Sequence, residues 1–313
     1  LAAAIYGASE GLDVLVLEST APGGQAGSSS RIENYLGFPM GISGQELADR
    51  AYSQAEKFGS EIAIARTAKQ LDCAKRPYRV VMNDGHTVLA RSIVIATGAR
   101  YHKPALDSLQ RFEGIGVYYS ATAVEARLCG TEEVIVVGGA NSAGQAAVFL
   151  ANTARKVHMF VRGKALSDTM SRYLIRRIEE TAAIELHVET EITELRGERD
   201  LEGVTWVDKR TGEHVSRPIC HVFMMTGASP NTEWLERCVA IDDKGFIKVG
   251  NDLTREELDL AKWPMTRAPY LFETSLPGVF AVGDVRSNSI KRVASAVGEG
   301  SICIQLVHKV LNE

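Results

Sequence analysis

A glycine-rich hexapeptide near the middle of the sequence has the residue types and the setting of a phosphate-binding turn. It consists of Gly138, Gly139, Ala140, Asn141, Ser142 and Ala143. The hexapeptide follows the apolar run EVIVV and opens a segment with helical spacing, so a helix N-terminus would face a pyrophosphate there. Gly138 is expected to make the tight turn, and the small Ala143 lets the helix pack closely on the strand. Ala140 stands where a glycine usually lets the backbone approach the pyrophosphate, so we expect its methyl group to weaken binding.

The strand that follows this turn indicates which dinucleotide would bind. The run KVHMFVRG ends without the Asp or Glu that usually bonds the ribose hydroxyls of NAD. Arg162 and Lys164 stand there instead. Cations at this place favour a 2′-phosphate, so we predict NADPH as the preferred cofactor, with NADH as the alternative. The other interpretation of the two side chains is a solvated basic patch.

A second nucleotide-type pattern opens the sequence. Helical spacing over residues 1–9 is followed by DVLVLE, a strand whose last residue, Glu18, is an acid that could bond the ribose of an adenine dinucleotide. Near the other end of the sequence, TSLPGVFAVGDV reads as a strand that ends in Gly283 and Asp284, before a long amphipathic helix. In flavoproteins with two dinucleotide sites, such a Gly-Asp pair holds the ribityl and phosphate region. The sequence therefore predicts an α/β protein with two nucleotide-type units.

The composition is that of an ordinary globular protein. The 313 residues are enough for two domains. The net charge of −4 gives no reason to expect a nucleic acid or an acidic membrane as a partner. No apolar run approaches the ~18 residues of a membrane-spanning helix, so we predict no membrane partner either.

The cysteines and histidines of the sequence suggest no site of their own. The five cysteines, which form no C-x-x-C, are Cys73, Cys129, Cys220, Cys238 and Cys303. Scattered in this way, they indicate neither a zinc ribbon nor a redox dithiol, and we expect small buried core residues in a reducing cytoplasm. The histidines of the strand-like segments are His158, His187, His214 and His221. None has a partner carboxylate at a readable spacing, which favours core or surface roles.

Several longer motifs carry a family resemblance. They are PGGQ at 22–25, IENYLGFP at 32–39, IATGA at 95–99, TGASPNT at 226–232 and PGVFAVGDV at 277–285. In this order, over nearly the whole chain, the sequence resembles a low-molecular-weight thioredoxin reductase of the pyridine nucleotide-disulfide oxidoreductase family. The resemblance implies two Rossmann-like, three-layer ββα domains, with an NADPH domain (107–230) inserted into a split FAD domain (1–106 and 231–313). It also implies a homodimer and a domain rotation that presents the flavin in turn to NADPH and to a dithiol.

The resemblance assigns cofactor contacts to particular positions. Glu18 would bond the FAD ribose, Thr97 and Gly98 would lie by the FAD phosphates, and Asp284, with Gly283, would hold the ribityl-phosphate region. The residues implied around the flavin itself are Gly23, Gly24, Gln25, Asn34, Arg292, Val293 and Ala294. Val293 stands where the family has a glutamine. Gly227 joins the hexapeptide, Arg162 and Lys164 on the NADPH side.

The family also has a strand and a G-x-G-x-x-G/A loop that would come just before Leu1. We therefore expect this sequence to be a fragment that retains FAD poorly. The sequence after Tyr118 resembles that of a subgroup that often follows an N-terminal sensory domain in the same chain. Such a domain is therefore expected as a partner in the full-length protein.

The redox-active C-x-x-C of the family has no counterpart here. The corresponding stretch reads GVYYSATAVEARLCG, with Ser120 and Ala123 at the cysteine positions and Val124 in place of the acid that donates a proton. Serine and alanine cannot exchange with a disulfide, because that exchange requires thiolates. What remains is hydride transfer from NADPH to flavin and onward transfer to an unidentified acceptor, namely oxygen, a quinone or a redox protein. The alternatives are a thioredoxin reductase that recruits another thiol and a redox sensor without turnover.

Overall fold

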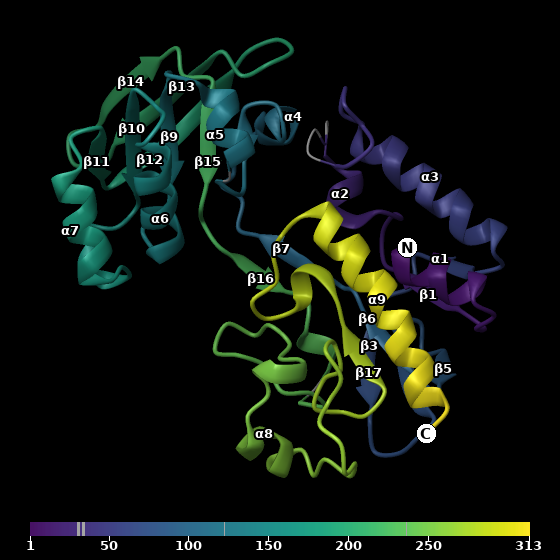
Figure 1. Cartoon of the computed structure of the whole chain (residues 1–313). Coiled ribbons are helices and arrows are strands. Elements are labelled where there is room, and N and C mark those ends of the chain that lie inside the picture. The colour runs from purple at the N-terminus through teal and green to yellow at the C-terminus, as the bar shows by residue number, and fades with distance from the viewer. Residues whose placement is uncertain (30–31, 33–34, 122, 236) are drawn as a thin grey trace. The chain divides into compact units, whose positions relative to one another are not determined.

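The described part of the computed structural model comprises residues 1–29, 32, 35–121, 123–235 and 237–313, and it divides into two units (Figure 1). Unit 1 combines Leu1–Arg100 with Ser229–Glu313, and unit 2 is the inserted segment Tyr101–Ala228. Both are α/β, as the sequence predicts. No helix among the described residues is long and apolar enough to cross a membrane.

Unit 2 contains one complete strand–turn–helix–strand sequence near its centre. Its elements are α4 (Leu109–Phe112), β8 (Val117–Tyr118), α5 (Ala123–Cys129), β9 (Glu133–Val137), α6 (Asn141–Leu150), β10 (Lys156–Val161), η1 (Leu166–Asp168), α7 (Arg172–Glu180), β11 (Ile184–Val188), β12 (Thr190–Arg196), β13 (Gly203–Asp208), β14 (Glu213–Arg217) and β15 (His221–Met224). Five of the strands form a parallel sheet in the order β11-β10-β9-β15-β8, and β12-β13-β14 form an antiparallel sheet.

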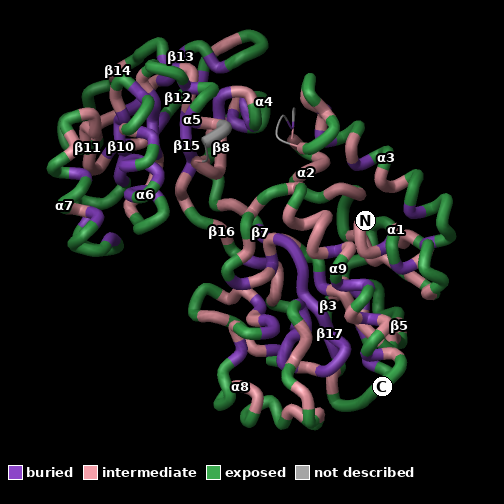
Figure 2. The backbone as a smooth tube through the Cα atoms, viewed as in Figure 1, coloured by how far each residue is buried: buried purple, intermediate pink, exposed green. Residues whose placement is uncertain are grey.

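The parallel sheet of unit 2 is covered on both faces. Along β9, Val134 and Val136 belong to the core shared with α6 and α7, whereas Ile135 belongs to the core on the opposite face, with Trp206 of β13. A strand buried on both sides needs apolar residues at every position, which is why EVIVV and the strand after it read as nearly unbroken apolar runs. Figure 2 shows β9, β10 and β15 as largely buried. Unit 2 therefore has the expected three-layer ββα architecture.

Unit 1 is built from the two ends of the chain. Its elements are α1 (Ala2–Ser9), β1 (Leu15–Glu18), α2 (Gly24–Gly27), α3 (Gly44–Lys57), β2 (Glu61–Ile64), β3 (Ala68–Asp72), β4 (Tyr78–Met82), β5 (Thr87–Ala90), β6 (Ile93–Ile95), β7 (Ala99–Tyr101), β16 (Ala228–Pro230), η2 (Glu233–Leu235), η3 (Gly250–Asp252), α8 (Arg255–Leu260), β17 (Val279–Ala281), η4 (Gly283–Val285) and α9 (Val293–Leu311). The strands β7 and β16, at which the chain leaves and re-enters the unit, pair with each other.

The core of unit 1 repeats the three-layer arrangement. The strands β6 and β17 pair in parallel, and β3-β4-β5 form an antiparallel sheet. Within β17, Val279 and Ala281 pack with residues of β3 and β4, whereas Phe280 packs with Ile304 and Val307 of α9. This strand thus separates the antiparallel sheet from the long helix. Two segments that are almost 200 residues apart in the sequence, β6 and β17, share one core.

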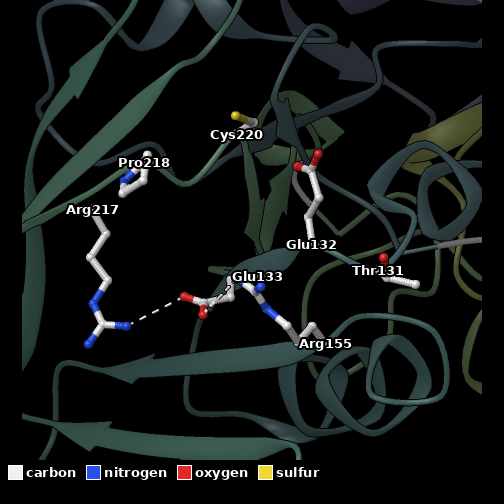
Figure 3. Close-up of a pocket in the computed structure, with 7 residues that line it drawn as sticks. All are labelled: Thr131, Glu132, Glu133, Arg155, Arg217, Pro218 and Cys220. Atoms are coloured by element: carbon white, nitrogen blue, oxygen red, sulfur yellow. Dashed lines mark hydrogen bonds and ion pairs between the residues drawn. The ribbon is translucent and has the colours of Figure 1, made fainter.

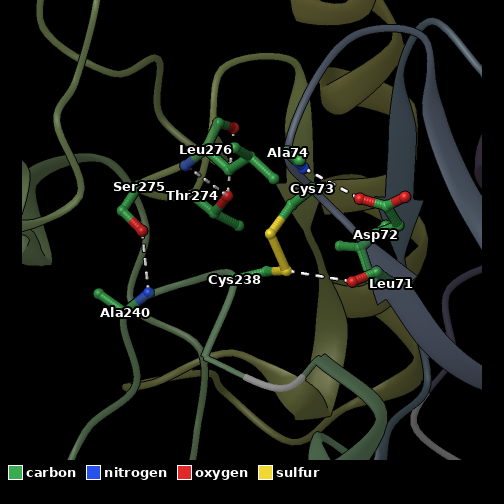
Figure 4. Close-up of a disulfide and its surroundings, with 9 residues drawn as sticks. All are labelled: Leu71, Asp72, Cys73, Ala74, Cys238, Ala240, Thr274, Ser275 and Leu276. Carbon is green, nitrogen blue, oxygen red and sulfur yellow. Dashed lines mark hydrogen bonds between the residues drawn. A yellow bond between two sulfur atoms is a disulfide. The ribbon is translucent and has the colours of Figure 1, made fainter.

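A disulfide joins Cys73, just after β3, to Cys238, 165 residues later in the sequence (Figure 4). The expectation of five separate core cysteines is therefore wrong for this pair, whereas Cys129 and Cys303 are buried as expected and Cys220 is half-buried. The sequence does not indicate this pairing, because β3 and the segment after η2 come together only when unit 1 folds. The bond links the first stretch of unit 1 to the second, across the inserted unit.

Replacing both bridged cysteines, Cys73→Ser with Cys238→Ser, is expected to lower the free energy of unfolding of unit 1 by roughly 2–4 kcal/mol relative to the oxidised protein, because the cross-link closes a long loop in the unfolded chain. Urea unfolding followed by circular dichroism measures this difference. The matched control is Cys220→Ser, which removes an unbridged thiol. Equal stability of the oxidised parent and the double variant would show that the cross-link does not restrain the unfolded chain.

Candidate cofactor-binding sites

The glycine turn of unit 2 needs glycine at its first position. Gly138 has φ +148°, and a Cβ there would lie 2.4 Å from the carbonyl oxygen of Met225 and 2.9 Å from the Cβ of Ala143. The turn is therefore in close contact on one side with the backbone just after β15 and on the other with the first turn of α6. Ala143 is fully buried, and a larger side chain there would push the helix away from the sheet. The N-terminus of α6 is held at the carboxyl end of β9 by this contact.

Residues that follow β10 fix the rest of the turn. Thr169 Oγ1 donates a 2.8 Å hydrogen bond to the carbonyl of Gly139, and the amide of Ser171 donates one of 2.8 Å to Asn141 Oδ1. Thr169 and Ser171 lie about 30 residues beyond the hexapeptide, and no local pattern singles them out. They position the turn. The amide of Ala143 donates a 2.9 Å hydrogen bond to the carbonyl of Ala140, so the amides that a ligand could reach are those of Asn141 and Ser142, at the helix end.

Ala140 does not strain the turn. It is the N-cap residue of α6, with φ −95° and ψ 174°, an extended conformation that any residue adopts. Its side chain and those of Asn141 and Ser142 are exposed. The backbone of this position therefore accepts alanine, and only a steric conflict with a bound pyrophosphate could weaken binding.

The basic pair predicted for the 2′-phosphate lies beside the same turn. Arg162 and Lys164 are exposed and follow β10 directly. The amide of Gly138 donates a 3.0 Å hydrogen bond to the carbonyl of Phe160 in that strand, which ties the turn to the strand end. Gly227, the remaining residue assigned to this side, has φ +87° and accepts a 3.0 Å hydrogen bond from the amide of His102.

In unit 1 the parallel pairing of β6 and β17 brings two predicted loops to one edge. The amide of Val282 continues the ladder to the carbonyl of Ile95 at 3.0 Å, so the segments 96–98 and 283–284 leave the sheet side by side. Thr97 is locked to Asn231 by reciprocal bonds: Thr97 Oγ1 donates to the Asn231 carbonyl at 2.8 Å, and Asn231 Nδ2 donates to the Thr97 carbonyl at 2.7 Å. The amide of Asn231 also donates to the carbonyl of Gly98.

A carboxylate that the sequence did not single out holds the Gly-Asp turn. Glu299, in α9, accepts a 2.7 Å hydrogen bond from the amide of Gly283, which has φ +70°. Arg286 completes the contact by donating to both oxygens of Glu299, at 3.2 and 2.5 Å. The sequence does not indicate this role, because Glu299 lies 16 residues beyond Gly283 and has the spacing of an ordinary polar residue in a long helix.

The side chain of Asp284 is half-buried beside a lysine. Burial raises the pKa of its carboxyl, and the positive charge of Lys291 offsets part of that rise. The Lys291 ammonium also donates to the Asp284 carbonyl oxygen at 3.3 Å. Lys291 is followed by Arg292, the N-cap of the 19-residue helix α9, and by Val293 and Ala294 in its first turn. The N-terminus of α9 thus lies close in the chain to the Gly-Asp turn.

The remaining residues assigned to FAD lie near the start of the chain. Gly23 has φ +101°, and a Cβ there would lie 2.4 Å from that of Ala48 in α3, so the position requires glycine. Gly24 opens α2, and Gln25 Nε2 in its first turn donates to the carbonyl of Ala99. Glu18 ends β1 and accepts a 2.8 Å hydrogen bond from the amide of Thr20. Asn34 lies outside the described residues.

The positions of the missing dithiol carry no substitute. Ser120 is half-buried two residues after β8, and Ala123 is the first residue of α5. Cys129, at the end of α5, is fully buried, and burial raises the pKa of its thiol to about 12. Burial also raises the thiol pKa of Cys303 to about 12. A thiol with such a pKa is almost wholly protonated at neutral pH and is a poor nucleophile.

Cys220 lines a separate hollow of about 540 Å³ in unit 2 (Figure 3). The other residues around it are Thr131, Glu132, Glu133, Arg155, Arg217 and Pro218. Glu133 is the first residue of β9, whereas the glycine turn follows the last one, so the hollow lies at the amino end of that strand. Burial and the neighbouring acids raise the pKa of the Cys220 thiol. The hollow is therefore neither the nucleotide site nor the place of an activated thiol.

Three of the four histidines do have carboxylate partners, and the first is His221, whose Nε2 lies 3.6 Å from Glu132 Oε2. His158 Nε2 lies 3.2 Å from Glu133 Oε2, and His187 Nε2 lies 3.5 Å from Glu185 Oε1. The prediction that they lack such partners is wrong. The parallel pairing of β9 and β10 brings Glu133 to His158 from a distant part of the sequence, whereas Glu185 lies two residues before His187 on the same strand and so points to the same face. His214 is exposed, as expected.

Known proteins with this pattern share both the sequence and the fold. The family model for pyridine nucleotide-disulphide oxidoreductases matches residues 1–300. A thioredoxin reductase from Rickettsia conorii is 31% identical over 100% of this chain and 95% of its own length, and one from Bacillus subtilis is 30% identical over 100% and 92%. The crystal structure of thioredoxin reductase from Streptococcus pyogenes, at 28% identity, has a TM-score of 0.84 over 99% of this chain and 94% of that one.

The similarity is not confined to one part of the chain. The family model extends across both units, including the inserted one, and both relatives match over the whole chain. The chain belongs to the pyridine nucleotide-disulphide oxidoreductase family, among proteins similar to thioredoxin reductases.

Proposed function

We propose that the chain is an FAD-dependent NADPH oxidoreductase of the thioredoxin reductase type that delivers its electrons without an internal dithiol. The observation that carries the proposal is the combination of two helix N-termini beside glycine turns with serine and alanine at the positions of the family's cysteines. FAD, when bound, supplies a hydride acceptor that can release electrons singly or in pairs. The residues of the chain bind, orient and charge-balance the two cofactors.

The inserted unit fits NADPH. A Cβ at Gly138 would clash with its neighbours, so only glycine fits the turn. The first turn of α6, whose first two residues are exposed, would direct amides and a positive dipole end to a pyrophosphate. Arg162 and Lys164 stand beside it, where a 2′-phosphate would need cations, and Gly227 lies on the segment that closes over the turn. We propose that these residues select NADPH over NADH.

Unit 1 fits FAD. Asp284 is a desolvated carboxylate next to the cation Lys291, a pair that polar ribityl and phosphate groups would complete. Thr97, Gly98 and Gly283 would lie at the same edge, and Gly23, Gly24 and Gln25 would border the ring system with Arg292, Val293 and Ala294. The dipole of α9 would stabilise negative charge on the reduced ring by about 0.3–1 kcal/mol. Glu18 would bond the adenine ribose.

The acceptor is the part of the function that departs from the relatives. The names of the relatives state a reduction of thioredoxin, which in a dithiol mechanism passes through thiolates. The unbridged thiols here have raised pKa values, so we propose oxygen, a quinone or a redox protein as the acceptor. We also propose a homodimer located in the cytoplasm.

Mixing the FAD-loaded full chain with NADPH under anaerobic conditions is expected to bleach the flavin absorbance within a second, because hydride transfer needs no thiol. Turnover with thioredoxin or an aromatic disulfide is expected to stay near background. The variant Ser120→Cys with Ala123→Cys is the matched gain-of-function control and should raise disulfide turnover without changing the bleaching rate. Flavin that stays oxidised would favour a sensor, and disulfide turnover that is lost on replacing Cys73 and Cys238 would favour a relocated dithiol.

Removing the two cations beside the glycine turn is expected to reduce the preference for NADPH. In Arg162→Ala with Lys164→Ala, the KM for NADPH should rise about tenfold or more, because each charge-assisted bond to a phosphate is worth roughly 1.5–3 kcal/mol, whereas the KM for NADH should change little. Initial rates of flavin reduction measure both constants. The control is Arg199→Ala, an exposed cation elsewhere in unit 2. An equal rise for both nucleotides would remove the 2′-phosphate assignment.

Loss of the carboxylate under the Gly-Asp turn is expected to weaken FAD binding. Glu299→Ala leaves the amide of Gly283 and the guanidinium of Arg286 without their acceptor, and a charge-assisted bond of this kind is worth roughly 1.5–3 kcal/mol. We expect the Kd for FAD, measured by quenching of flavin fluorescence, to rise by tenfold or more. Glu56→Ala, an exposed glutamate in α3, is the control. Unchanged FAD affinity in Glu299→Ala would show that the turn does not depend on this contact.

A further inference from the structure

A cluster of side chains of the types that bind metal ions lies in unit 2, among residues that do not belong to the glycine turn. His158 of β10 pairs in register with Glu185 of β11, and Phe160 pairs with His187. Residues that pair across parallel strands, and residues two apart along one strand, point to the same face of a sheet. His158, Glu185 and His187 therefore project together from the face that β13 covers. Glu185 and His187 belong to β11, the strand at one edge of the parallel sheet.

The ligand atoms of these side chains lie close enough together to bind one ion, with one atom from each residue within 4.8 Å of the others. His158 Nδ1 lies 3.1 Å from His187 Nε2 and 3.9 Å from Glu185 Oε2, and His187 Nε2 lies 3.5 Å from Glu185 Oε1. Bonds of zinc to nitrogen and oxygen of about 2.0–2.1 Å place neighbouring ligands of a tetrahedron about 3.3 Å apart. We propose that His158, His187 and Glu185 bind one divalent cation of the zinc type, with water as the fourth ligand.

A fourth residue supports the site from outside the ligand set. Metal-binding histidines commonly donate their second ring N–H to a carboxylate, which fixes the tautomer and makes the other nitrogen a better ligand. Glu133 Oε2 lies 3.2 Å from His158 Nε2 and is in position to accept that proton. Glu133 is itself held by Arg155 at 3.1 Å and Arg217 at 3.5 Å (Figure 3). The lone pair of His158 Nδ1 is thereby directed toward His187.

Packing holds the two imidazole rings in place. The Trp206 ring centroid lies 6.0 Å from that of His158 and 6.3 Å from that of His187, and the Phe160 ring contacts His187 edge-on at 5.2 Å. Without a cation, a hydrogen bond between His158 Nδ1 and His187 Nε2 fills the space. On binding, the His187 proton moves to its Nδ1, so the two rings stay neutral and the cation keeps its charge.

The cluster is open to solvent on one side. The His158 side chain is 1% exposed, that of His187 is 21% and that of Glu185 is 43%, so a cation can enter past the carboxylate and retain a water there. Lys156 forms an ion pair with Glu185 Oε2 and competes with the cation for this ligand. A bound cation would tie the edge strand β11 to β10, and this role is independent of the proposed redox function.

The test uses the full chain, freed of any affinity tag and of metal, and zinc chloride as the probe. Calorimetric titration is expected to show one equivalent bound, with affinity weakened at least tenfold in His187→Gln and in Glu185→Gln. Glu133→Gln should weaken binding by about 10–100-fold through the loss of the supporting carboxylate. His214→Gln, an exposed histidine of the same unit, is the control and should bind as the parent does. Lys156→Gln should bind more tightly, because the competing charge is gone.

Two further readouts do not involve activity. Co²⁺ should give the intense visible absorption of a tetrahedral site, and Cu²⁺ should quench Trp206, the one tryptophan of unit 2. Circular dichroism of each variant confirms that its fold is retained. The proposal is overturned if the parent binds no zinc at micromolar concentration, or if His187→Gln and Glu185→Gln bind as tightly as the parent and His214→Gln do.

Discussion

The glycine turn between a parallel strand and the helix after it is the constraint on which the molecule depends. In unit 2 the Met225 carbonyl and the Ala143 methyl leave no room for a side chain at Gly138, and this contact sets α6 against the end of β9. In unit 1 the turn at Gly283 is held by Glu299, from the helix that it precedes. Each arrangement places a helix N-terminus near the carboxyl edge of parallel strands, where open α/β sheets bind their ligands.

The parts of this arrangement that are local in the sequence could be predicted from it. The run EVIVV and the hexapeptide after it specify strand, turn and helix within 20 residues, and the structure has β9 and α6 there. The start of α3 also has a local signal, because Ser43 accepts a 3.1 Å hydrogen bond from the amide of Glu46, three residues later. Such elements form because the hydrophobic period and the capping residues act over a few neighbouring positions.

The contacts between segments that are far apart in the sequence could not be predicted. Cys73 meets Cys238, and His158 meets His187 and Glu133, only after separate strands have paired. Glu299 and Thr169 hold their glycine turns from later segments, and neither carries a local signal. The family resemblance supplies the overall fold, yet it contains no information about a bridge or a histidine cluster that belongs to this chain. Distance along the sequence therefore separates what could be predicted from what could not.

On the proposed function, the absence of a C-x-x-C would change where electrons can go without altering the residues proposed to bind the two nucleotides. A thiol that is buried and protonated, such as Cys129, cannot replace a pair of thiolates, so the reduced flavin would have to meet its acceptor directly. The acceptor would then be selected by its access to the flavin and by its reduction potential, and not by thiol–disulfide exchange. On this proposal the fold would serve cofactor binding, and Ser120 and Ala123 would determine which acceptors can react.

Counting reducing equivalents tests the central claim most directly. The FAD-loaded chain is titrated with NADPH under anaerobic conditions while the flavin absorbance is followed. If the flavin is the redox centre and no dithiol exchanges with it, one NADPH per flavin should complete the bleaching. A requirement for two NADPH per flavin, with a second pair of electrons stored in thiols, would contradict the account.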